Sequence, residues 1–266
     1  MAGNSPYPGT QAVVRAISVL KAFTDENPEW SLTPLARELG LNKATTYRLL
    51  TALESESLIV RVPDSDKYRL GPGMVTLGGR ALRANNLRAV SQEELQALAK
   101  KTNETASLEV LHGAEVLILD EASGQHVMGG ARAIGSRWAA HATSTGKALL
   151  AALPDAELEE TLPSPLPAFT KHTVTSLDKL RQELAQVREQ GYAVADQELE
   201  VGLVAIGAPL RNHDGAIIAA ISVAGPTLRL TGDDIPEVAT LVTEAAARIS
   251  SQLGYRAPGA GQAEKH

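Results

Sequence analysis

The sequence predicts an α+β protein made of two domains and a joining helix. At 266 residues the chain is longer than most single domains. Its first part shows three short helical patterns followed by two strand patterns, and from Ser91 onward helical and strand patterns alternate. We therefore expect a first domain at 1–71, a linker helix at 72–89, a second domain at 90–254 and a disordered tail at 255–266.

Composition narrows the class of protein further. Hydrophobic residues make up 44% of the chain, the formal net charge is −6, and cysteine is absent, which excludes disulfides and cysteine-based catalysis within this chain. No segment approaches the roughly 20 apolar residues that span a bilayer, and the first residues lack signal-peptide features. We expect a cytoplasmic protein without a membrane partner. Basic residues exceed acidic ones only in the first 88 residues.

The first two helices are predicted by apolar periodicity and by their end residues. One runs from Thr10 to Ala22 and stops before the segment that contains Pro28. The second lies within 31–39, with Thr33 expected as its N-cap, Pro34 at its first position and Gly40 ending it.

A third helix follows the turn at Gly40, from Asn42 to Leu53. Its leucines are expected to face inward together with Tyr47, and four polar residues are expected to face outward: Lys43, Thr45, Thr46 and Arg48. Two short helices joined by a glycine-containing turn are typical of a helix-turn-helix, whose second helix enters the major groove of DNA. The alternative is an ordinary helical fold whose basic residues only hydrate its surface.

Two strands, at 57–62 and 67–70, are predicted to form a hairpin after the third helix. Such a hairpin is the wing of a winged helix-turn-helix, and it carries Arg61, Lys67 and Arg69. A Gly-Pro-Gly break at 71–73 then precedes a helical pattern from Met74 to Leu87, which contains Gly78 and Gly79.

The C-terminal part is predicted to place helices around a sheet. Helices are expected at 91–101, 145–153, 176–190 and 233–253, and strands at 106–111, 116–120, 192–196, 203–210 and 216–223.

The run LARELGLNKATTYRLLTAL followed by YRLG resembles the N-terminal domain of the isocitrate lyase regulator (IclR) family. Two further stretches, HATSTGKALLA and GYAVADQELEVGLVAIGAPLRNHDGAIIAAISVAGP, resemble the effector-binding domain of these regulators, whose fold is similar to GAF domains. The resemblance covers about Val13 to Leu253 and implies a transcription regulator that binds operator DNA and a small-molecule effector. It also implies a homodimer, paired partly through the first helix, or a tetramer of two dimers.

The resemblance assigns residues to each site. The DNA contacts would come from Lys43, Thr45, Thr46 and Arg48 with the wing residues Arg61, Lys67 and Arg69. The effector would meet polar groups at Ser144, Thr145, Asp196 and Ser222 and apolar walls at Leu119, Met128, Ala205 and Ala224. Free N–H groups at a helix N-terminus from Ser144 to Gly146 favour a carboxylate, so an organic or aromatic acid is expected. Each polar residue also has a purely structural interpretation, as a helix cap, a bonded buried hydroxyl or a hydrated loop residue.

Two other classes of function are alternatives to a regulator. An enzyme is weakly supported, because the STGK string lacks the remainder of a phosphate-binding loop and no GxSxG motif is present. The six histidines show no metal-ligand spacing, so neither a metal nor a cofactor is expected. The remaining alternative is a small-molecule sensor that acts through protein partners.

Overall fold

The computed structural model describes residues 10–83, 86–124 and 134–256. The chain forms two compact units, which meet in sequence between Ala84 and Asn85, inside the segment expected as a linker. Met128 and the tail residues 257–266 lie outside the described residues.

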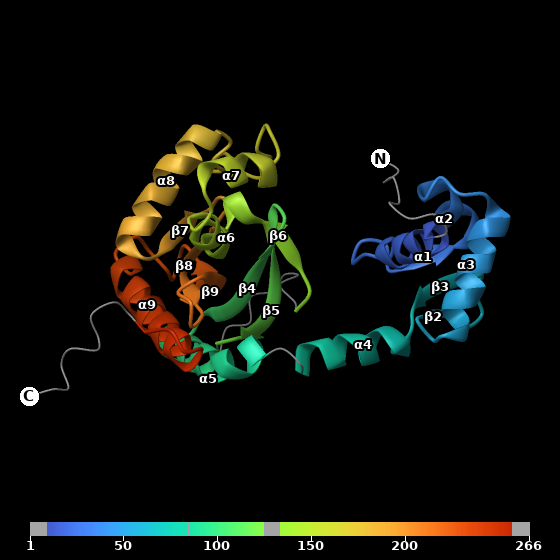
Figure 1. Ribbon diagram of the computed structural model, residues 1–266, viewed down its shortest axis with the longest axis horizontal. Helices are drawn as coiled ribbons and strands as arrows, with labels where there is room; N and C mark the ends of the chain where they lie inside the picture. Colours follow the sequence, from blue (N-terminus) through green and yellow to red (C-terminus); the bar gives the residue numbers. More distant parts are fainter. Residues whose placement is uncertain (1–9, 84–85, 125–133, 257–266) are drawn as a thin grey trace, which may run out of the picture. The chain divides into compact units, whose positions relative to one another are not determined.

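The first unit contains the three predicted helices, α1 (Gln11–Lys21), α2 (Leu32–Glu38) and α3 (Lys43–Ser55), and then α4 (Pro72–Arg83) (Figure 1). Its small antiparallel sheet has the order β1-β3-β2, with β1 at Glu29–Ser31, β2 at Ile59–Arg61 and β3 at Lys67–Leu70. Strand β1 was not predicted, because three residues are too short to show the two-residue period of a strand. The expected N-cap was wrong: Ser31 precedes α2, and Thr33 lies inside it.

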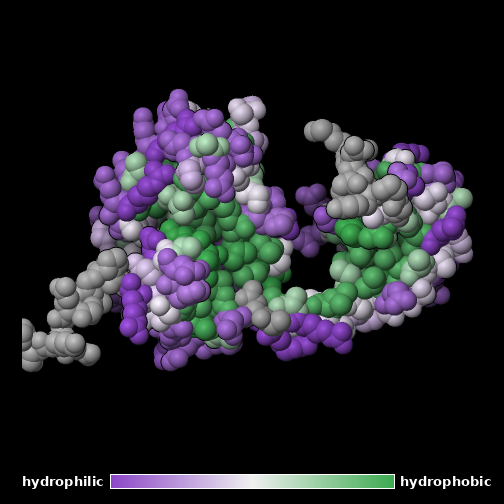
Figure 2. Space-filling view, viewed as in Figure 1, coloured by the Kyte–Doolittle hydropathy of each residue, from purple (hydrophilic) through white to green (hydrophobic). Residues whose placement is uncertain are grey.

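Side chains from α1, α2, α3 and the sheet pack together in the hydrophobic core of this unit. Val19, Leu35, Leu50 and Ile59 are fully buried in it. Some apolar side chains stay exposed, however: Val13, Val14 and Ile17 on α1, and Val75 and Leu77 on α4. Figure 2 shows hydrophobic areas on the surface of this unit. Because burial of apolar area is the main stabilising term in folding and association, these helices have faces that a partner surface would cover.

The second unit is built on a six-stranded antiparallel sheet with the order β6-β5-β4-β9-β8-β7. Its strands are β4 (Thr105–His112), β5 (Glu115–Ala122), β6 (Arg137–Ala139), β7 (Ala193–Asp196), β8 (Leu203–Arg211) and β9 (Ile217–Pro226). All but β6 were predicted. Strand β6 is a three-residue edge strand, again too short for its period to be read.

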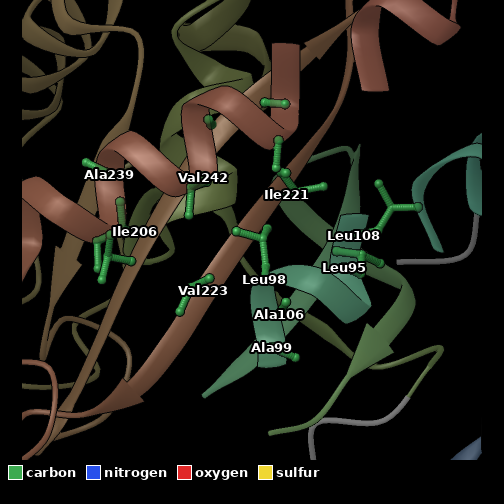
Figure 3. Packing of buried hydrophobic residues seen from close by; sticks show 14 of the residues in the cluster. Leu95, Leu98, Ala99, Ala106, Leu108, Ile206, Ile221, Val223, Ala239 and Val242 are labelled. Atoms are coloured by element: carbon green, nitrogen blue, oxygen red, sulfur yellow. The ribbon is translucent and has the colours of Figure 1, made fainter. Parts of the chain in front are cut away.

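Helices cover both faces of this sheet (Figure 1). On one face, α5 (Asn86–Thr102) and α9 (Ile235–Gln252) pack their leucine, valine and alanine side chains against alternate residues of β4, β8 and β9. Figure 3 shows this contact, with Leu98 and Val242 from the helices beside Ile221 and Val223 of the sheet. Helix α5 begins before the predicted 91, and α4 ends before the predicted 87.

The other face of the sheet is covered by the short helix η1 (Ala140–Ala142), α6 (Ser144–Leu150), α7 (Asp155–Thr161) and α8 (Leu177–Gln190). Leu180, Leu184 and Val187 of α8 are buried as predicted, and Gly191 ends the helix in the left-handed conformation. The predicted arrangement of helices around a sheet is confirmed, and it has three layers: helices, sheet and helices.

Candidate functional site

Helix α3 is fixed at its start by Asn42 and at its inner face by buried residues. The backbone N–H of Thr45 donates to Asn42 Oδ1 at 2.8 Å, which caps the helix. Thr46, Leu50 and Leu53 are buried at helical spacing. The outward orientation expected for Thr46 is therefore wrong: its side chain is 0% exposed and donates to the Asn42 carbonyl oxygen at 3.1 Å.

The solvent-facing side of α3 carries Lys43, Tyr47, Arg48 and Thr51, with Thr45 partly exposed. Tyr47 was expected in the core, but its side chain is 47% exposed. Thr46, Leu50 and Leu53 are spaced so that they lie on one side of an α-helix with 3.6 residues per turn, and this side is buried. Tyr47 therefore lies on the exposed side. Hydroxyl and basic groups on an exposed helix after a tight turn are what major-groove readout requires.

The strands beside α3 carry the three predicted wing residues on their exposed side. Arg61 pairs with Glu54 of α3 at 3.3 Å and lies over the ring of Tyr68 at 5.2 Å. Tyr68 and then Glu54 hold the pKa of Arg61 above its usual value. Lys67 pairs with Glu29 at 3.4 Å, while Arg69 is exposed on the same strand. Arg61 and Lys67 thus each have an acidic neighbour within this unit.

The second unit holds a small cavity, with both polar and apolar walls, between the sheet and the start of α6. Its free volume is about 30 Å³, room for about one water molecule, so the walls must move to admit a larger ligand. All six strands of the sheet and α6 contribute to its lining. The lining combines hydroxyls, two carboxyl groups and apolar walls: Thr105, Ser107, Glu109, Ile118, Glu121, Trp138, Ala142, Thr143, Ser144, Thr145, Ala195, Leu199, Leu203, Ala205 and Ser222.

Glu109 organises the polar side of this cavity. Its carboxyl group accepts hydrogen bonds from Ser107 Oγ at 2.7 Å and from Thr145 Oγ1 at 2.5 Å. The oxygens of Ser107 and Ser222 are 2.9 Å apart. All four side chains are buried, and together they join β4, β9 and α6 around one acid.

Four of the expected effector residues meet at this cavity: Ser144, Thr145, Ala205 and Ser222. Leu119 does not, because it packs in the core on the opposite face of the sheet while its neighbour Ile118 faces the cavity. Asp196 is exposed at the end of β7, and the wall is formed by Ala195 and Leu199 instead. Ala224 is buried beside Ala205 in the sheet but is not part of the cavity lining.

Several lining residues were not predicted. Thr105, Ser107 and Glu109 alternate along β4 and so share one face, a two-residue period that the sequence displays. Trp138 lies on β6, and its buried indole Nε1 has no hydrogen-bond partner among the described residues. The structure also changes the basis for expecting a carboxylate ligand, because the Gly146 N–H already donates to Thr143 Oγ1 at 3.1 Å.

Behind the cavity, α6 is anchored by a buried lysine. Lys147 is 2% exposed, and its Nζ lies 2.6 Å from Glu183 Oε2 of α8 and 2.5 Å from Glu198 Oε1. Burial raises the pKa of Glu198 above its ordinary value, against the opposing effect of the Lys147 charge. The lysine that resembled part of a phosphate-binding loop therefore holds helices together.

His141 is the other buried titratable group beside α6. Its Nε2 donates to the Pro167 carbonyl oxygen at 2.9 Å, and its ring lies near Phe169. Burial lowers the pKa of His141 below its ordinary value. Within the described residues, no three acidic or histidine side chains are grouped as metal ligands, and no helix is long and apolar enough to cross a membrane.

One unit has an exposed recognition helix and a wing, and the other has an enclosed cavity with polar and apolar walls. Together these features define the class of protein, a DNA-binding transcription regulator with a ligand-binding domain. Two family models match the chain. The IclR helix-turn-helix domain matches residues 12–63, and the bacterial transcriptional regulator IclR C-terminal domain matches residues 79–251. The chain belongs to the IclR family of transcriptional regulators.

Curated relatives and solved structures agree with this assignment. The chain is 33% identical to the HTH-type transcriptional regulator XynR of Escherichia coli over 94% of this chain and all of that protein. It is 31% identical to the Escherichia coli transcriptional repressor IclR over 92% of this chain and 90% of that protein. These relatives are regulators, so the expectation that the chain is not an enzyme is confirmed.

Two crystal structures show the same architecture. An IclR transcriptional regulator from Alicyclobacillus acidocaldarius superposes with a TM-score of 0.81, is 30% identical, and is matched over 91% of this chain and 98% of that chain. An IclR homologue from Microbacterium hydrocarbonoxydans in complex with 4-hydroxybenzoate has a TM-score of 0.79, 29% identity and the same coverage. The predicted α+β fold and the prediction that the effector is a small molecule are thereby confirmed.

Proposed function

We propose that this regulator acts in the cytoplasm as a homodimer, or a pair of homodimers, that binds its operator through α3 and the wing. The observation that carries the proposal is the exposed face of α3, where Lys43 and Arg48 stand beside Tyr47 while Thr46 is withdrawn into the core. Arginine and lysine are the usual readers of guanine, and hydroxyls bond bases or phosphates. Thr45 and Arg69 complete the exposed set.

Arg61 and Lys67 have a different part in this proposal. Their ion pairs with Glu54 and Glu29 hold them against the unit, and a phosphate must compete with those carboxylates. We assign them to backbone contacts, which position the protein without reading sequence.

The dimer is proposed from the apolar faces left open on α1 and α4. Val13, Val14 and Ile17 lie within two turns of α1, and a second copy of the same helix would cover them symmetrically. A twofold dimer presents two recognition helices to two half-sites of an operator, and the affinity of the pair exceeds that of one.

The effector is proposed to bind in the cavity lined by Ser144, Thr145, Ala205 and Ser222. The cavity has the polar groups and apolar walls of a small-molecule site, and it must widen on binding. A ligand that binds the widened form more tightly shifts the population between conformations and so alters DNA affinity.

A gel-shift titration with the DNA upstream of the regulator's own gene tests this function. We expect a specific complex that resists competition by unrelated DNA at moderate salt. The absence of a sequence-specific shift, with and without small-molecule extracts, would overturn the proposal and favour a sensor that acts through protein partners.

A further inference from the structure

We propose that the second unit contains a second ligand site, a groove beside α9 that binds a small organic acid through its carboxylate group. The groove has a volume of about 450 Å³ and lies between the end of β8, the C-terminal part of α9 and the residues just after α9. It shares no lining residue with the cavity proposed for the effector. This site goes beyond the proposed function.

The groove forms because β8 extends further than its neighbour β7. Strand β7 begins at Ala193, opposite Gly207, so among the described residues no strand lies beside the last part of β8, 208–211, on that side. Helix α9 lies against β8 there with small side chains, among them Ala246 and Ser250, which leave space between the two elements. The volume is within the range of small-molecule sites, about 300–1,000 Å³.

Arg211, the last residue of β8, is held in a fixed position in this groove. Its backbone N–H donates to Ser250 Oγ at 3.0 Å, and its Nη1 donates to the Gly215 carbonyl oxygen at 2.9 Å. Its guanidinium carbon lies 5.8 Å from the centre of the Tyr255 ring. These contacts position the guanidinium group without neutralising its charge, since none of them involves a carboxylate.

The lack of a carboxylate partner is unusual in this unit, where acidic residues outnumber basic ones. Among the described residues, most arginines of the unit pair with a carboxylate: Arg88, Arg137, Arg181, Arg229 and Arg248. Of the others, Arg188 donates to two carbonyl oxygens just after α6, whereas Arg211 and Arg256 both line the groove. No acidic side chain of the described chain lines it. Two arginines without an acidic partner therefore contribute to one groove.

A carboxylate is the ligand group that suits these arginines. A guanidinium group stays charged, and its N–H donors match the two oxygens of a carboxylate. Ala208, Pro209 and Ala247 add apolar surface for the body of a ligand. A small acid with an apolar body meets both parts of the groove, whereas the corresponding amide meets the apolar part without forming an ion pair.

The direct test compares benzoate with benzamide, which has the same ring and no charge. Thermal-shift titrations of the full-length protein give an apparent dissociation constant for each, because a ligand of the native state raises the melting temperature. Sodium chloride keeps the ionic strength constant. We expect benzoate to bind about tenfold more tightly, the factor for one hydrogen bond to a charged group. Equal binding of the two probes, or no binding of benzoate, would overturn the proposal.

Two substitutions locate the bound benzoate. Arg211→Gln removes the charge, and Ala247→Trp fills the groove from an exposed position of α9, so each should weaken benzoate binding about tenfold. The matched control is Lys179→Gln, which removes one positive charge at an exposed position near the start of α8 and should leave the constant unchanged. Wild-type affinity in both groove variants would mean that benzoate binds elsewhere, and the site would be rejected.

A chain that ends at Arg256 tests the alternative occupant, the segment 257–266. Benzoate should bind this shortened chain as tightly as the full-length protein. Binding that appears only after the segment is removed would assign the groove to the chain's own C-terminus and contradict the proposal. Operator binding without benzoate is measured for every variant, so a folding defect or a failure of the DNA-binding proposal is distinguished from a failure of this one.

Discussion

Lys147 of α6 and Glu198, just after β7, form a buried ion pair with 2.5 Å between Nζ and Oε1. Glu198 precedes Leu199, which lines the cavity, and Lys147 follows Thr145, which bonds Glu109. The ion pair therefore joins the two segments, α6 and the loop after β7, that contribute Thr145 and Leu199 to the cavity wall.

Replacing Lys147 by Met should strongly destabilise the second unit. The substitution keeps most of the side-chain volume but leaves the carboxyl group of Glu198 buried without its cation, which costs about 3–5 kcal/mol of unfolding free energy. Urea denaturation followed by circular dichroism measures the loss. Joint replacement of Lys147 and Glu198 by Met and Leu should recover most of it, and Arg137→Ala, which breaks an exposed pair with Glu115, should cost less than about 1 kcal/mol. Equal losses in all three variants would contradict the role given to this pair.

The burial of His141 predicts that the protein becomes less stable against unfolding at mildly acidic pH. Its pKa in the folded protein lies below the ordinary value because it is buried. As pH falls through about 6.5, the unfolded chain takes up a proton that the folded chain refuses, so stability decreases until the lowered pKa is reached. Melting temperatures from pH 8 to 5 should show this decrease, and His141→Gln should reduce it. His172→Gln, at an exposed histidine, should retain the wild-type slope, and a His141→Gln slope equal to wild type would refute the explanation.

Two glycines in helices should respond in opposite ways to alanine. At Gly146 an added Cβ would lie 2.1 Å from the Ala140 carbonyl oxygen, so Gly146→Ala must displace the start of α6 and should lower the melting temperature. At Gly78 of α4 nothing lies within 4 Å, so Gly78→Ala should stabilise the helix by up to about 1 kcal/mol. Thermal melts of the two variants check both signs, and a stable Gly146→Ala protein would show that α6 is packed more loosely than described.

The exposed side of α3 predicts the effect of substitutions on operator binding. Arg48→Ala should weaken specific binding by about 1–3 kcal/mol if the guanidinium bonds a base, and Tyr47→Ala should weaken it as well. Thr46→Val should instead act on stability, since its hydroxyl donates to Asn42 within the protein. Gel-shift titrations measure the affinities, with Lys179→Ala of α8 as a control at an exposed lysine of the other unit. Unchanged affinity in both Arg48→Ala and Tyr47→Ala would show that α3 does not read the operator.

The open face of α1 predicts the effect of a charge on assembly. Ile17→Asp places a carboxylate among Val13 and Val14, where a second copy is proposed to pack, and should weaken the dimer and operator binding together. Light scattering across a concentration series measures the assembly. Arg15→Asp, on a less exposed position of the same helix, is the control for charge alone. A wild-type protein that remains a monomer at high concentration would exclude the proposed dimer.

The sequence by itself determined most of the helices and strands, though not α7, β1 or β6, and it determined the family through motifs spread along both units. The helix-turn-helix was predicted because local features specify it: the turn at Gly40 and the apolar spacing of α3. The cap at Asn42 was found only in the structure. The two-residue period of a strand also puts Ser107 and Glu109 on one side of the predicted strand at 106–111, although neither was predicted as a site residue.

Only the tertiary structure decided which of these residues share a site. Glu109 and Thr145 are 36 residues apart, and Ser107 and Ser222 are 115 apart, so their contacts depend on the pairing of β4 with β9 and on the docking of α6. Packing within the second unit turned Leu119 away from the cavity and left Asp196 at the surface. In the first unit, the packing of α3 against α1 and α2 buried Thr46. A sequence pattern fixes the side of an element on which a residue lies, but packing against the rest of the fold decides what that side meets.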